Sequence, residues 1–79
     1  MKTFTIHLDV SHEATVEHVA QFAHQHDCYI RSVELNGPAG GNPCYEFGAF
    51  NFSALRTLAE DILGRTMDEE EIKTRIVEH

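Results

Sequence analysis

The sequence predicts one α+β domain over residues 1–79, a two-layer sandwich in which strand, helix, strand, strand and helix are followed by a C-terminal helix or a fourth strand. Three observations predict it. Residues 3–10, TFTIHLDV, alternate apolar and polar side chains, as in a strand with one wet face. Residues 12–26 and 51–63 repeat apolar side chains at helical spacing. Between these helices, two short apolar runs flank a segment rich in glycine and proline.

The first helix is expected to follow the first strand directly. Ser11 precedes the run HEATVEHVAQFAHQH and has a side chain suited to an N-cap. Glu13 and Glu17 lie early in this run, whereas His24 and His26 lie late, and this order of charges suits the helix dipole. We therefore expect the helix to begin after Ser11 and to end near His26.

Two strands are expected at residues 29–35 (YIRSVEL) and 44–50 (CYEFGAF), which are rich in β-branched and aromatic residues. The segment Asn36–Pro43 contains three glycines and two prolines, so we expect a loop that joins the strands as a hairpin. Gly48 indicates a bulge or a close backbone approach. The preceding strand–helix–strand order suggests a parallel crossover, which together with the hairpin predicts a mixed sheet.

The second helix carries the clearest start and stop signals. Asn51 is a suitable N-cap, and Phe50 and Leu55 have the spacing of a hydrophobic staple. Gly64 has the residue type expected just after the last turn. The nearby aromatic side chains are expected mainly in the core: Tyr45, Phe47, Phe50 and Phe52.

The tail, residues 67–78, supports two interpretations. Thr66 and Glu69 match a capping box, and Glu71 and Arg75 form an i, i+4 ion pair of the favourable orientation, which together favour a helix. The run IKTRIV also alternates, which favours a strand. We favour the helix, and with the strand the order would be that of a ferredoxin-like fold.

The element order also resembles that of ACT-type regulatory domains, which are βαββαβ units. Those domains usually carry an Asp-x-x-Gly-like turn after the first strand, and the corresponding residues here, Asp9 to His12, lack the glycine. The resemblance is one of element order. It implies, as an alternative function, a regulatory domain that binds a small molecule and acts as a homodimer.

Charge and composition limit the possible partners. The net charge is −7 with neutral histidines, and only six scattered Lys and Arg residues are present. Direct binding of nucleic acid or of an anionic membrane is therefore not expected, since both need clustered basic side chains. No apolar run is long enough for a membrane span, the start does not read as a signal peptide, and two cysteines are too few for a disulfide scaffold, so we expect a cytoplasmic protein.

The segment His24–Tyr29, HQHDCY, is the one stretch that suggests a metal site. His24, His26 and Cys28 could converge at an irregular turn, but zinc typically needs a fourth ligand, and no second pair with ligand spacing exists. We interpret the stretch as the polar end of a helix. The hairpin would also hold Cys28 and Cys44 more than about 20 Å apart, too far for a disulfide. No enzymatic activity and no cofactor are expected.

We expect a small, acidic, non-catalytic protein that binds and modulates another protein. Accessory and inhibitor proteins encoded by phages or bacteria share this character. The partner surface would be an exposed sheet face or an acidic C-terminal region, which could meet a basic surface. This acidic C-terminal region comprises Glu60, Asp61, Asp68, Glu69, Glu70 and Glu71. A homodimer is possible, and a metal-binding module is a further alternative.

Overall fold

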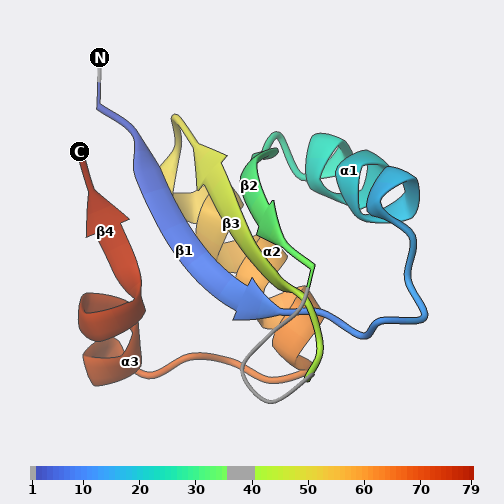
Figure 1. Cartoon of the computed structure of the whole chain (residues 1–79). Helices are drawn as coiled ribbons and strands as arrows, with labels where there is room; N and C mark the ends of the chain where they lie inside the picture. The colour runs from blue at the N-terminus through green and yellow to red at the C-terminus, as the bar shows by residue number, and fades with distance from the viewer. Residues whose placement is uncertain (1, 36–40) are drawn as a thin grey trace.

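The strands form one four-stranded antiparallel sheet, ordered β2-β3-β1-β4, in the computed structural model of the chain (Figure 1). The structure describes residues 2–35 and 41–79. No helix in these residues is long and apolar enough to cross a membrane. The elements follow in the order β1 (Phe4–Asp9), α1 (Val16–Gln25), β2 (Tyr29–Glu34), β3 (Cys44–Ala49), α2 (Phe52–Leu63), α3 (Glu69–Arg75) and β4 (Ile76–Glu78).

The sheet is not mixed, which corrects the expectation from the crossover. β1 and β2 do run parallel to each other, because each is antiparallel to β3, but β3 lies between them. This insertion gives the backbone of β3 a hydrogen-bonding neighbour on each side, which a central strand requires. Only residues 41–43 of the expected loop Asn36–Pro43 belong to the described part of the chain, because residues 36–40 lie outside it.

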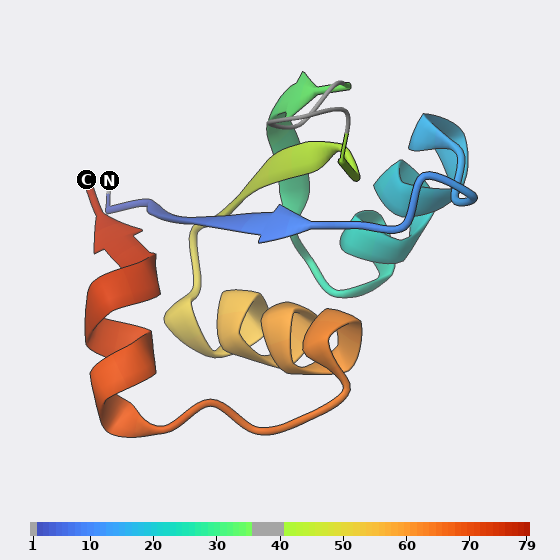
Figure 2. The same ribbon diagram turned by 60° about the horizontal axis from the view of Figure 1, so that its bottom comes forward.

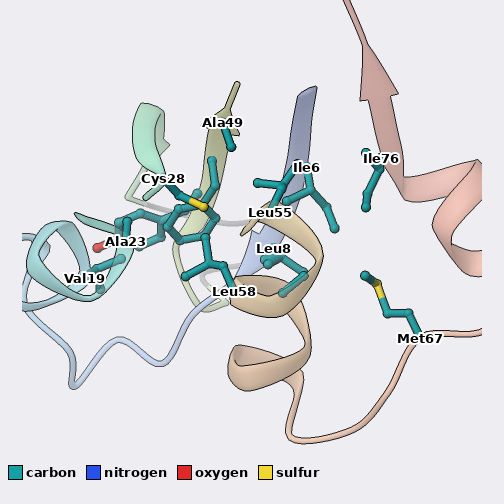
Figure 3. Packing of buried hydrophobic residues seen from close by; sticks show 13 residues of the cluster. Ile6, Leu8, Val19, Ala23, Cys28, Ala49, Leu55, Leu58, Met67 and Ile76 are labelled. Carbon is teal, nitrogen blue, oxygen red and sulfur yellow. The ribbon is translucent and has the colours of Figure 1, made fainter. Parts of the chain in front are cut away.

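The core lies between the sheet and α2, which Figure 2 shows along one side of the sheet. α2 contributes Leu55, Leu58 and Ala59, which are fully buried, and α1 contributes Val19 and Ala23. Figure 3 shows these side chains gathered against the strands. The strand residues of this core alternate along their strands. Ile6 and Leu8 do so as the pattern in residues 3–10 predicted, and β3 adds Tyr45, Phe47 and Ala49.

α1 begins four residues later than Ser11 would place it. Its N-cap is Thr15, whose hydroxyl accepts a hydrogen bond from the backbone N–H of His18 at 3.1 Å. Ser11 instead closes a separate turn, in which its carbonyl accepts from the N–H of Ala14 at 3.1 Å. The prediction of Ser11 as the cap was wrong because two hydroxyl residues precede the apolar residues of α1. The second of them, Thr15, stands directly before the first helical residue, Val16.

α1 ends at the stretch HQHDC in a Schellman motif. The N–H of Cys28 donates to the carbonyl of Ala23 at 2.8 Å, and the N–H of Asp27 donates to the carbonyl of His24 at 3.0 Å. Asp27 has the left-handed φ of 59° that this motif needs and that glycine usually provides. The stretch is thus a helix end, as the sequence indicated, closed by an aspartate in a strained conformation.

α2 has the expected cap and stop but not the expected staple. The Asn51 side chain accepts from the N–H of Ser53 at 2.8 Å, and Gly64 takes a φ of 73°. Leu55 is fully buried, whereas Phe50 is 59% exposed and packs on Tyr29 with ring centroids 5.7 Å apart. Phe50 therefore belongs to the sheet surface and not to the core, which corrects its assignment.

The tail contains both structures that the sequence left open. α3 occupies residues 69–75, and its N-cap is Asp68, whose carboxylate accepts from the N–H of Glu71 at 2.8 Å. The predicted Thr66–Glu69 capping box is therefore not formed. β4 follows at once and pairs antiparallel with β1, so that Ile76 lies opposite Ile6. The backbone changes from helix to strand directly after Arg75, and this change lets the chain bury Ile76 beside the core.

Replacing Asp27 by glycine should raise the free energy of unfolding by about 0.5–1 kcal/mol, because glycine adopts the left-handed conformation without a steric cost. Urea denaturation followed by circular dichroism measures this. Asp27→Asn is the control, since it removes the same charge and keeps a side chain. A glycine variant no more stable than the asparagine variant would show that the strain at this residue is negligible.

Candidate functional site

The open face of the sheet, the one turned away from the buried strand residues and α2, is the candidate functional site. Strand alternation places Thr5, His7 and Asp9 of β1 on this face, together with Cys44, Glu46 and Gly48 of β3. We call this surface the open face. Its side chains lie in rows across the strands, and three rows differ in chemistry.

The first row is Tyr29, Gly48, Thr5 and Val77, one residue from each strand. The Tyr29 ring lies over Gly48, where a Cβ atom would come within 2.7 Å of the ring. The close neighbour of Gly48 is therefore a side-chain ring and not backbone, and the strand irregularity lies in β2, between Ile30 and Ser32, which corrects the prediction at Gly48. Exposed fractions are 36% for Tyr29, 59% for Phe50 and 50% for Val77, and we call these three side chains the apolar patch.

Thr5 is the buried polar residue of this row, with an exposed fraction of 4%. Its hydroxyl lies 2.8 Å from Nε2 of His79. The backbones of Thr3 and His79 exchange hydrogen bonds, which extends the pairing of β1 with the C-terminal segment. These contacts hold β4 in register and keep Val77 on the open face.

The second row centres on the Glu46 carboxylate. Ser32 donates its hydroxyl to this carboxylate at 3.2 Å, and Nε2 of His7 and Nη1 of Arg31 lie 3.6 Å from it. In a Ser–His–carboxylate triad the histidine bridges the other two groups, whereas here the carboxylate is the shared partner. The row is therefore a set of contacts centred on Glu46, in which Ser32 meets the carboxylate and not the histidine.

The third row consists of Asp9, Cys44 and Glu34. Burial and the negative charges of Asp9 and Glu34 raise the pKa of the Cys44 thiol, so the thiol stays protonated at neutral pH. Both carboxylate residues are exposed, and neither forms an ion pair with any residue in 2–35 or 41–79. We call Asp9 and Glu34 the acidic end of the open face.

The predicted acidic C-terminal region is divided among structural contacts. Glu71 receives two hydrogen bonds from Arg65, at 2.6 and 2.7 Å, and one from Arg75 at 3.2 Å. The hydrogen bonds from Arg65, together with the one from Arg75, lower the pKa of Glu71 to about 2. Asp68 has no ion pair among the described residues but caps α3, so Glu69 and Glu70 are the members of this run whose side chains have neither an ion pair nor a capping role there.

The other two members of that region point elsewhere. Glu60 accepts from the backbone N–H of Met67 at 2.9 Å and from Nε of Arg56 at 3.3 Å. The Met67 hydrogen bond is the main cause that lowers the pKa of Glu60, and the Arg56 contacts add to it. Asp61 faces the end of α1. The structure therefore does not gather all six predicted acidic side chains into one unpaired patch.

His26 links α1 to α2. Its Nδ1 lies 2.9 Å from the carbonyl oxygen of Phe22, and its Nε2 lies 2.7 Å from Oδ2 of Asp61. Both ring nitrogens thus face acceptors, which the doubly protonated imidazolium satisfies. The backbone hydrogen bond to Phe22 raises the pKa of His26, and Asp61 raises it further, although burial acts in the opposite direction.

The structure places the three metal candidates in different surroundings. His24 is exposed in the last turn of α1, His26 contacts Phe22 and Asp61, and Cys28 is a free, buried thiol that donates to the carbonyl of His26 at 3.4 Å. Burial and the nearby Asp27 charge raise the pKa of Cys28 to about 11. Within residues 2–35 and 41–79, no group of three or more His, Cys, Asp or Glu side chains is arranged to hold a metal ion. Cys44 is also a free thiol.

An apolar groove with a volume of about 260 Å³ lies between α1 and α2. This volume is at the small end of the range for small-molecule sites. His18 is the single polar residue in its lining, which otherwise consists of Val10, Ala14, Val19, Phe22 and Ile62.

The stability of the protein should fall as the pH rises above the unfolded-state histidine pKa of about 6.5. Folding raises the pKa of His26. Its contribution to the free energy of unfolding is therefore fully present below the unfolded-state pKa and is lost as the pH rises through the folded-state pKa. Denaturation at a series of pH values, with wild type beside His26→Gln, measures the difference. A pH dependence unchanged in the variant would contradict the assignment.

Asp61→Asn should lower the free energy of unfolding by less than about 1 kcal/mol, since its ion pair with His26 is partly exposed.

Comparison with protein-family models, with curated proteins and with solved structures found no match for this chain. The function must therefore be inferred from the geometry of the residues themselves.

Proposed function

We propose that this chain is a small non-catalytic protein that binds and modulates another protein through the open face of its sheet. The observation that carries the proposal is the apolar patch, in which Tyr29, Phe50 and Val77 are all exposed on one side of the molecule. A cluster of large exposed apolar side chains on a small domain is typical of an interaction surface.

The residue types in the patch also support binding. Aromatic residues are enriched where partners meet, because they bury a large area with few rotatable bonds. Gly48 leaves the space that the Tyr29 ring occupies, so the ring is positioned before a partner arrives. Such preorganisation reduces the entropic cost of binding.

The basic side chains support a protein partner over nucleic acid. All but one of the six Lys and Arg residues lie in contact with a carboxylate of this chain: Lys2 with Glu78, Arg31 with Glu46, Arg56 with Glu60, and Arg65 and Arg75 with Glu71. A phosphate backbone would have to compete with these internal partners.

We also propose that the fold is of the ferredoxin-like type. The strand order β2-β3-β1-β4 with two helices in the two crossovers corresponds to a ferredoxin-like layout, with α3 added before β4. A cytoplasmic location and an accessory or inhibitor role in a phage or bacterial system complete the proposal. Two free thiols support a reducing compartment.

Two alternatives have specific support. Glu69 and Glu70, exposed at the start of α3, could form a smaller acidic surface for a basic partner. The apolar groove between α1 and α2 could accept a small molecule, as an ACT-like homodimeric regulatory domain would require.

The double variant Tyr29→Ala/Phe50→Ala should reduce capture of the partner at least about tenfold, because interface aromatic residues often dominate binding. Affinity purification from source cells with quantitative mass spectrometry measures this. Val16→Ala is the matched control, since Val16 is also an exposed apolar residue but lies on α1. Circular dichroism should show both variants folded. Equal capture by the double variant and the control would contradict binding through the open face.

A further inference from the structure

We propose, on the basis of the proposed function, that the open face binds one amphipathic α-helix of its partner, with apolar side chains over the apolar patch and Lys or Arg side chains over the acidic end. The open face is one side of a sheet whose other side is packed against α2. An antiparallel sheet commonly leaves one face open, and a partner helix on that face would add a third layer.

The width of the apolar row suits one helix. Tyr29, Gly48, Thr5 and Val77 span three interstrand spacings of about 4.8 Å, which gives roughly 14 Å. An α-helix with its side chains is about 10–12 Å across. A helix lying along β3 and β1 would therefore contact Tyr29 and Phe50 on one side and Val77 on the other.

The spacing along the strands sets the pattern of the partner. Asp9 lies four residues beyond Thr5 in β1, a distance of roughly 13 Å. A helix covers this distance in about nine residues. Residues that share a helix face near this distance recur about seven and about eleven positions on, which is roughly 10 and 16 Å along the axis. The partner helix should therefore carry its basic side chains about seven to eleven positions from its apolar side chains, on the same face.

Charge favours a basic partner over a second copy of this chain. The carboxylate of Glu46 is already paired with Arg31, whereas Asp9 and Glu34 have no ion pair among the described residues and are the acidic groups of the open face that a partner can neutralise. A second copy would bring a further net charge of −7 against this surface. Like charges across an interface weaken association.

The proposal is tested with two synthetic 18-residue helical peptides. Each carries leucines on one face of its first half, followed on the same face by lysines in one peptide and by glutamates in the other. Calorimetry should show the lysine peptide binding at least about tenfold more tightly, and less tightly as salt is raised. NMR should show amide shifts at Thr5, Gly48 and Val77 on binding.

Matched charge variants locate the basic contact. Asp9→Asn/Glu34→Gln and Glu69→Gln/Glu70→Gln both change the net charge from −7 to −5. The first variant should weaken binding of the lysine peptide roughly three- to tenfold, and the second less than about twofold. The reverse order would overturn the proposal and assign the basic contact to α3.

The remaining outcomes separate this inference from the proposed function. If both peptides bind equally and shift the amides of the open face, that face binds proteins but has no preference for a basic partner, and the inference fails alone. If Tyr29→Ala/Phe50→Ala leaves lysine-peptide binding unchanged, the open face is not the site and both fail. If light scattering shows a dimer that Phe50→Ala dissociates, a second copy occupies the face and the inference is overturned.

Discussion

The pairing of β3 with both β1 and β2 is the constraint on which the rest of the structure depends. It sets Leu8 opposite Tyr45, and Tyr45 opposite Val33, on the helix side of the sheet. The same register sets Thr5 opposite Gly48, and Gly48 opposite Tyr29, on the open face. A shift of one residue would exchange the two faces and expose the core, so the hydrophobic effect on one face determines what the other face presents.

The helices are positioned largely by contacts at their ends. The Schellman motif at Asp27 turns the chain into β2, and His26 at the same place reaches Asp61 of α2. At the other end of the molecule, Glu71 holds Arg65 and Arg75 and so connects α3 to the segment before it. Many of the acidic side chains are therefore used within the fold, and a high negative charge in the sequence does not translate into one acidic surface.

The open face combines three chemistries within a small area. Exposed aromatic and aliphatic side chains lie at one end, Glu46 with its partners Ser32 and Arg31 lies in the middle, and two exposed carboxylates without an ion pair among the described residues lie at the other end. An apolar surface alone would accept many partners, including another copy of itself. The two carboxylates restrict the choice, because electrostatic complementarity contributes more to specificity than to affinity. This combination of side chains is what the proposed selective binding would use.

The sequence by itself determined the local structure of this protein. The alternation in residues 3–10 predicted β1, the spacing of Leu55 and Leu58 predicted α2, and Asn51 and Gly64 marked its ends, because these signals depend on neighbours a few residues away. The burial of Tyr45 and Phe47 was expected from their aromatic side chains. Both structures considered for residues 67–78 occur in turn, as α3 and β4, but only Ile76 and Val77 of the alternating run IKTRIV lie in the strand.

Only the tertiary structure decided the candidate site. The order of the strands depends on which edge the hairpin occupies, and that choice rests on contacts between residues far apart in the chain. Without these long-range contacts, the sequence could not show that Phe50 packs on Tyr29 and not in the core. It could not show either that Asp61 contacts His26 and does not join an acidic region. Side chains from all four strands make up the open face, so local sequence determined its pieces, and the long-range pairing of β3 brought them together.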